Sequence, residues 1–271
     1  MRERIIYPND NCNTGANVKI GFPNHPREEI LKEIEWIGKN RFDFIDIFLE
    51  EDKATPEQIR IKKTKELLDY YKLDRVGHTA WYLPIGSPVK EFRQAARKEA
   101  KKYFEVFSQL EVKYVTVHGN WPSTMFTDEE GIKYQVETLE RMIDEAKKYN
   151  LSIMYESIDT PRDNATNVAK ILNALPELYF HLDIGHANIH GRKPEEFVKA
   201  FSDRLKHIHL HDNNGKEDLH LPMGTGNINW PEFIKTLKEN YDGTITLEIF
   251  SKDKDYALLS KEKLRKMWDL A

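Results

Sequence analysis

Histidine and carboxylate residues recur at the ends of short apolar segments along this 271-residue chain. Six successive segments end on a residue that can bind a metal ion or move a proton. In chain order these residues are His78, His118, Glu156, Asp183, His209 and Glu248. Imidazole and carboxylate groups suit zinc, manganese, cobalt or iron. Three carboxylates converging in a buried pocket would repel one another unless a cation lay among them. The pattern therefore predicts a divalent metal site.

Three further residues extend this set to nine candidate ligands. His186 lies three residues after Asp183, and Asp218 and His220 lie in the segment that follows His209 and His211. Nine ligands are more than one ion can use, so we expect one to three ions, Zn²⁺ or Mn²⁺, with Glu156 as a shared carboxylate. His181 and His207 are expected to pack lower in the fold. His211 is either a supporting group or, if its strand runs one step longer, itself a ligand.

Alternating strands and helices must position these residues. The predicted strands cover residues 18–22, 42–48, 75–78, 114–118, 152–156, 179–183, 205–211 and 244–248. Thr55-Pro56 and Ser87-Pro88 are typical helix starts. Eight strands, each followed by a helix, predict an α/β fold, a single closed (β/α)₈ TIM barrel over residues 1–271 with residues 1–16 as an N-terminal extension. An open doubly wound sheet is the alternative, but no glycine-rich loop follows the first strand.

Composition excludes several classes of function. With 41 Lys and Arg against 45 Asp and Glu, the net charge of −4 argues against a protein that binds polyanions by bulk charge. The single cysteine, Cys12, can form no internal disulfide and no structural zinc site. No apolar run approaches the roughly 18 residues needed to span a bilayer. We therefore expect a soluble, cytoplasmic protein with no membrane partner.

The motifs together resemble the xylose isomerase-like barrels, which include sugar isomerases and epimerases and the endonuclease IV class. They read His78-Thr79-Ala80-Trp81, Val117-His118, Asp183-Ile184-Gly185-His186, His209-Leu210-His211-Asp212 and Asp218-Leu219-His220, with Glu156 and Glu248. In the nuclease branch the resemblance implies three zinc ions. They would be held by His78, His118 and Glu156, by Glu156, Asp183, His209 and Glu248, and by His186, Asp218 and His220. In the sugar branch it implies one metal on Glu156, Asp183, His209 and Glu248, with His186 touching substrate.

Two departures separate the branches. The ketose 3-epimerases of the family place an extra Glu after strand five and an Arg after strand seven, where this chain has residues 157–162 without Glu and Asn214-Gly215. The nuclease branch has an arginine-bearing loop after strand two. Here that loop reads Glu50-Glu51-Asp52, which would repel a phosphate backbone.

These residues lead us to expect a metal-dependent isomerase or epimerase of a small sugar or sugar phosphate. Glu156 and Glu248 would move a proton through an enediolate, and His186 would orient the substrate. Trp81, Trp121, His211 and Lys216 are the other candidate substrate contacts, Lys216 or Arg192 for a phosphate. The alternative is an endonuclease IV-like zinc phosphodiesterase acting at abasic sites. Nucleic acid is the less favoured partner, and the stretch 121–126 is a candidate homodimer contact.

Overall fold

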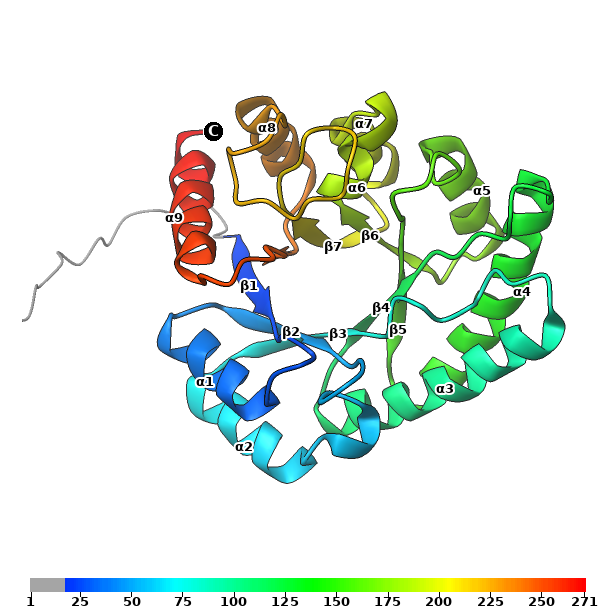
Figure 1. Ribbon diagram of the computed structural model, residues 1–271, viewed down its shortest axis with the longest axis horizontal. Helices are drawn as coiled ribbons and strands as arrows, with labels where there is room; N and C mark the ends of the chain where they lie inside the picture. The colour runs from blue at the N-terminus through cyan, green and yellow to red at the C-terminus, as the bar shows by residue number, and fades with distance from the viewer. Residues whose placement is uncertain (1–17) are drawn as a thin grey trace, which may run out of the picture.

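Eight parallel strands close into a barrel in the computed structural model, which describes residues 18–271 (Figure 1). The expected N-terminal extension and Cys12 lie outside the described residues. In order, the strands are β1 (Lys19–Pro23), β2 (Phe44–Phe48), β3 (Asp74–His78), β4 (Tyr114–His118), β5 (Ser152–Glu156), β6 (Tyr179–Asp183), β7 (Leu205–Leu210) and β8 (Thr244–Leu247). Strand β1 pairs with both β2 and β8, which closes the ring. The predicted TIM barrel is confirmed.

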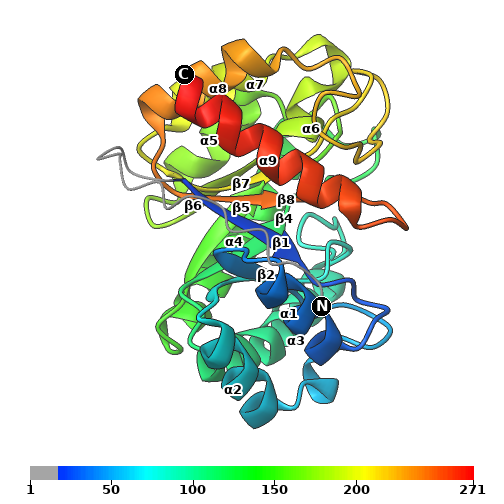
Figure 2. The same cartoon turned by 90° about the vertical axis from the view of Figure 1, so that its left-hand side faces the viewer.

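The helices surround the strands (Figure 1). They are α1 (Ile30–Lys39), α2 (Ile61–Tyr71), α3 (Lys90–Gln109), α4 (Asp128–Lys147), α5 (Ala165–Ala174), α6 (Ile184–Asn188), α7 (Pro194–Phe201), α8 (Trp230–Asn240) and α9 (Asp255–Leu270), with 3₁₀ helices at Pro56–Gln58 and Ile189–Gly191. Helix α9 packs against β8 and crosses the outside of the barrel (Figure 2). Within residues 18–271, every helix is too short or too polar to cross a bilayer.

Several predicted boundaries were wrong by one or two residues. Strand β7 ends at Leu210 and β8 at Leu247, so His211 and Glu248 lie just beyond their strands. Thr55-Pro56 begins a 3₁₀ helix, and α2 starts only at Ile61. Ser87-Pro88 precedes α3, which starts at Lys90. Proline fixes its own backbone angle but cannot decide whether the next turn continues as a helix.

The buried interior divides into two apolar regions and one polar layer. Most of the core lies between the strands and the surrounding helices. Inside the barrel, Phe44, Val76 and Met154 close the amino-terminal end. Because side chains alternate along a strand, the residues two positions further on form the next inward layers. His181 and His207, both fully buried, therefore lie one step below Asp183 and His209, as the sequence predicted.

Candidate metal centre

Glu156 stands at the centre of the carboxyl-terminal rim of the barrel. Its Oε2 atom lies 3.0 Å from Nε2 of His78 and 2.8 Å from Nε2 of His118. Its other oxygen, Oε1, lies 3.4 Å from Nδ1 of His209. Three histidines, from β3, β4 and β7, therefore face one carboxylate from β5, which is the arrangement expected of a shared ligand.

His209 connects this group to the carboxylates on the far side of the rim. Its Nδ1 lies 3.0 Å from Oε2 of Glu248 and 3.9 Å from Oδ2 of Asp183. The strand register explains this, since β6 pairs with β7 so that Asp183 stands opposite His209. Glu248 immediately follows β8, the other neighbour of β7.

A third group lies beside the second and is built from loops. Oδ2 of Asp218 is 2.9 Å from Nε2 of His220 and 3.3 Å from Nε2 of His186. His220 Nδ1 is also 3.5 Å from Oε2 of Glu248, and His186 Nδ1 is 3.8 Å from Oδ1 of Asp183. The structure thus brings all nine predicted ligands into one continuous network.

Local backbone contacts fix the rings of three histidines. Nδ1–H of His78 donates to the carbonyl of Thr79 at 2.8 Å, and that of His186 donates to the carbonyl of Ser157 at 2.9 Å. Nδ1–H of His220 donates to the carbonyl of Glu248 at 3.1 Å. Each bond leaves Nε2 free to face a carboxylate, since a neutral imidazole carries only one N–H.

The turn into α6 positions two ligands at once. Asp183 is the N-cap of that helix, and its Oδ1 accepts the backbone N–H of His186 at 2.7 Å. Capping by a carboxylate stabilises the start of a helix because it satisfies an unpaired donor there. The strand end and the first turn of the helix therefore hold Asp183 and His186 in a set relation.

The buried polar atoms at the rim are better placed to bind a cation than to form hydrogen bonds with one another. Among the described residues, Oε1 of Glu156, Nδ1 of His209 and Oδ1 of Asp218 make no hydrogen bond, although each is buried. His209 Nδ1 is only 3.0 Å from a Glu248 oxygen, so these atoms converge without donor–acceptor alignment. Unsatisfied buried groups are rare and call for a partner. Imidazole and carboxylate ligands provide a site suited to a divalent metal.

The charges of the site are strongly coupled. Burial would raise the pKa of Glu156, but His118, His181 and His209 hold it well below its ordinary value. Burial would lower the pKa of His209, but Glu248 and Glu156 raise it well above its ordinary value. The same balance raises the pKa of His220 to about 9, against burial, chiefly through Glu248 and Asp218. Protons on these imidazoles and bound cations would therefore compete for the same carboxylates.

A cavity of about 1050 Å³ opens above the rim. Its lining includes the candidate ligands His78, His118, His186, Asp218, His220 and Glu248. Trp81, which is 59% exposed, stands at the wall as the sequence predicted, together with Tyr82 and Phe250. Glu50 also lines it, and burial raises the pKa of this carboxyl to about 7.

Other predicted substrate contacts lie elsewhere. The ring of Trp121 packs on the guanidinium of Arg162, 4.8 Å away, outside the cavity lining, because the loop after β4 turns outward toward α4. Lys216 is exposed in the loop after β7, whose backbone turns around Asn214, and it also lies outside the lining. Arg192 donates to the carbonyls of Thr160 and His186 instead of facing a ligand.

His211 lies behind Asp183 in this structure, and together with His220 and Glu248 it forms one of the groups whose atoms could hold a metal ion. It is fully buried and lies outside the cavity lining, unlike the expected substrate contact. Its Nε2 lies 3.0 Å from Oδ1 of Asp183, and its ring stacks on that of His220 with centroids 4.0 Å apart. His209, one alternation earlier on β7, is the residue that faces Glu156 and Glu248.

Sequence reasoning missed Asp46 on β2. This carboxylate is fully buried, and its Oδ2 is within 3.0 Å of Nε2 of both His207 and His209. The segment reads Phe44-Ile45-Asp46-Ile47-Phe48, so a lone charge in an apolar strand was the available signal. Phe48 was missed as well, and its ring stacks on His78 at 4.2 Å.

Comparisons with known proteins place the chain in one family. The family described as xylose isomerase-like TIM barrel matches residues 33–267. An uncharacterised protein of Methanocaldococcus jannaschii is 29% identical over 90% of this chain and 86% of its own length. An L-ribulose 3-epimerase of Methylomonas is 26% identical over 82% of this chain and 79% of its own length. The crystal structure of a D-tagatose 3-epimerase-like protein superposes with a TM-score of 0.83, at 28% identity over 93% of this chain and 98% of the other. The chain belongs to the xylose isomerase-like TIM-barrel family.

Proposed function

We propose that this protein is a metal-dependent epimerase or isomerase of a small sugar. The observation that carries the proposal is the position of Glu156 and Glu248, which both lie within 3.4 Å of Nδ1 of His209 beneath an open cavity. Sugar 3-epimerases among the relatives and structural neighbours support the same class of reaction.

Each residue of the proposed site has a separate role. Glu156, Asp183, His209 and Glu248 would hold the metal, which would polarise the oxygens of a bound carbonyl and its neighbouring hydroxyl. One of Glu156 and Glu248 would remove the proton from the carbon that bears this hydroxyl, next to the carbonyl, and the other would return a proton to the opposite face of the same carbon. The pKa of Glu156, lowered by the nearby histidines against the effect of burial, keeps that group ionised as a base.

Around this centre, the side chains of the cavity bind and shield the sugar. His186 borders the cavity, and its Nε2, which carries no hydrogen while Nδ1–H donates to Ser157, can accept from a substrate hydroxyl. Trp81 and Tyr82 provide an apolar wall that excludes water.

The charge of the cavity favours a neutral sugar over a phosphorylated one. Its acidic lining residues are Glu28, Glu33, Glu50, Asp159, Asp218, Glu248 and Asp253. Lys252 and Lys254 also line it, but Nζ of Lys254 is bound by both oxygens of Glu33, at 2.7 and 2.8 Å. A phosphate group would meet more negative than positive charge there.

Solvent deuterium exchange tests the proposal. The protein loaded with Mn²⁺ or Zn²⁺ is incubated in D₂O with a panel of ketoses, and proton NMR follows loss of the signal next to the carbonyl. We expect metal-dependent exchange that Glu156→Gln abolishes. Asp159→Asn, an exposed carboxylate on the same cavity wall, is the matched control and should retain it. Wild-type protein that binds metal yet exchanges no proton with any ketose would refute the proposal.

One observation favours a second candidate, a zinc phosphodiesterase acting on abasic DNA. The group of His186, Asp218 and His220 is complete, whereas a single-metal epimerase needs only Glu156, Asp183, His209 and Glu248. Against it, the loop after β2 carries the exposed Glu51 and Asp52 beside Glu50 of the cavity lining, and these acids would repel a phosphate backbone. Metal analysis and nicking of an abasic oligonucleotide distinguish the two candidates. About three zinc ions per chain and rapid nicking would favour the nuclease.

A further inference from the structure

A buried carboxylate lies beneath the metal centre and takes no part in the reaction just proposed. Asp46, on β2, is fully buried. Its Oδ2 accepts from Nε2 of His209 at 2.8 Å, from Nε2 of His207 at 3.0 Å and from Oγ1 of Thr246 at 3.1 Å. Three donors on one oxygen hold this carboxylate in place from β7 and β8.

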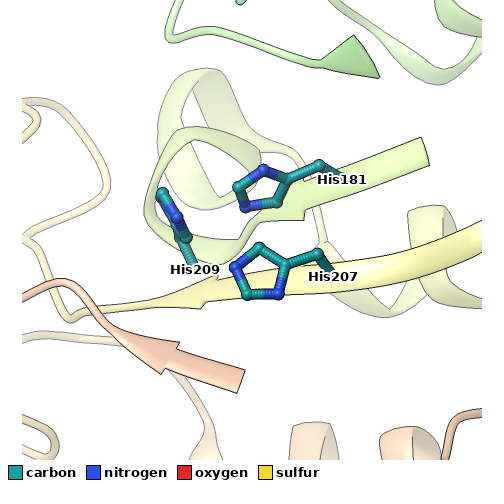
Figure 3. Close-up of side chains that lie close together, drawn as sticks. All are labelled: His181, His207 and His209. Atoms are coloured by element: carbon teal, nitrogen blue, oxygen red, sulfur yellow. The ribbon is translucent and has the colours of Figure 1, made fainter. Parts of the chain in front are cut away.

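The contact between Asp46 and His209 crosses the interior of the barrel. In the ring of strands, β8 and β1 lie between β7 and β2, so these two residues are not neighbours within the sheet. Thr246 on β8 stands opposite His209 in the strand register and also contacts Asp46. Figure 3 shows His209 beside His207 and His181, with the three rings gathered in the barrel. The carboxylate thus lies where residues from three strands converge.

This contact determines which nitrogen His209 presents to the rim. An ionised carboxylate can only accept, so Nε2 of His209 must carry the hydrogen that it donates to Asp46. In the neutral ring, Nδ1 then has a free lone pair. That atom lies 3.0 Å from Glu248 and 3.4 Å from Glu156, and within residues 18–271 it has no hydrogen-bond partner.

We propose that Asp46 is a positioning residue for the metal ligand His209. Its hydrogen bond fixes the orientation of the ring with Nδ1 toward the cation, and its negative charge strengthens that nitrogen as an electron-pair donor. Carboxylates bound to the far nitrogen of ligating histidines act in this way in metal sites generally.

The alternative use of this cluster is a separate metal site formed by His181, His207 and His209, whose ring nitrogens lie within 4.8 Å of one another. The hydrogen bonds argue against it. His207 has both nitrogens engaged, Nε2 with Asp46 and Nδ1 with Oγ1 of Thr244 at 2.7 Å. His209 would have to release Asp46 to turn Nε2 toward such an ion. The network is therefore arranged to support a ligand and not to bind a second cation.

Metal affinity of the purified protein tests the proposal without substrate. Asp46→Asn keeps one acceptor oxygen and the size of the side chain but loses the charge, and Asp46→Ala loses both. Zinc affinity is measured by competition with a chromophoric chelator. We expect a loss of roughly 10- to 100-fold for Asp46→Asn and a larger loss for Asp46→Ala.

His207→Gln is the matched control, because His207 contacts the same Oδ2 but none of the rim carboxylates. It should weaken zinc binding much less than Asp46→Asn does. An equal loss in His207→Gln would favour the three-histidine site and overturn the proposal. So would wild-type affinity in a folded Asp46→Asn protein, with folding checked by urea unfolding of the metal-free form.

A spectroscopic readout on the wild-type protein decides the case even if the Asp46 variants do not fold. Histidine ¹⁵N NMR of the zinc-loaded protein, with His209 assigned from a His209→Gln spectrum, should show Nδ1 bound to the metal and Nε2 protonated. Binding through Nε2 would overturn the proposal. The proposal rests on the metal centre of the proposed function, but neither measurement uses a substrate. Failure to find epimerization would therefore leave these outcomes unchanged.

Discussion

Substituting Gly185 by alanine should disrupt the metal centre through a steric contact. Gly185 lies in the first turn of α6, between the ligands Asp183 and His186. A Cβ atom on Gly185 would lie 1.8 Å from Cε1 and 2.4 Å from Nε2 of the His211 ring. Ordinary carbon contacts begin near 3.4 Å, so the ring would have to move by about 1.6 Å.

His211 has no room for such a movement. It is fully buried, its Nε2 is 3.0 Å from Asp183, and its ring stacks on that of His220. Overpacking costs about 1–3 kcal/mol, and losing a hydrogen bond to a charged group costs about 1.5–3 kcal/mol more. We therefore expect Gly185→Ala to lower the free energy of unfolding by about 2.5–6 kcal/mol and to reduce the amount of bound zinc.

A double-mutant cycle in urea identifies the cause. Where His211 is already alanine, the ring that the new methyl group would meet is gone, so Gly185→Ala should cost little more. The coupling between the two positions should then exceed the roughly 0.5 kcal/mol expected of independent sites. Additive costs, or a Gly185→Ala protein with the stability and zinc content of the wild type, would refute this account.

Three more predictions follow from the same structure. Protein with free metal at 100 times its dissociation constant should lose about 2.7 kcal/mol of its free energy of unfolding when a chelator removes the metal. Identical urea unfolding curves with and without chelator would contradict a bound ion. Burial raises the pKa of Asp163 from 3.8 to about 6, so the folded state binds this proton more tightly than the unfolded chain does. The contribution of this proton to the free energy of unfolding is fully present below pH 4 and is lost as the pH rises through 6. Relative to wild type, Asp163→Asn should therefore become more stable by up to about 3 kcal/mol between pH 4 and 7, and a constant difference across that range in urea titrations would show that the shift is absent. Trp81 is 59% exposed at the cavity wall. Trp81→Ala should raise KM by about 3- to 10-fold and leave the metal content unchanged. An unaltered KM in steady-state assays would show that Trp81 does not contact the substrate.

The convergence of the candidate ligands could be predicted because the strands of a barrel all end on one rim. Alternation along a strand then decides which residues point inward, and this rule placed His209 on the same face as His207. It could not choose between His209 and His211, which share that face. Only the point at which β7 ends, at Leu210, places His211 behind Asp183.

Residues in loops and across the barrel could not be predicted in this way. Trp121 follows His118 by three positions, but no periodic rule governs the path of the loop that carries it outward to Arg162. Asp46 lies 163 positions from His209 in the sequence, and only closure of the barrel brings them into contact. Lone polar residues in apolar strands, such as Asp46, are the signal that should be weighed more heavily.

Six of the candidate ligands lie at the ends of six different strands, β3 to β8, so the proposed binding site is complete only once β8 has joined the barrel. During synthesis, a ribosome-bound chain that has emerged only through β4 offers His78 and His118 without Glu156, the carboxylate that faces both in the folded protein. Tight loading of the cation must therefore follow completion of the ring. Metal capture can then serve as a marker that the whole polypeptide has reached its native topology.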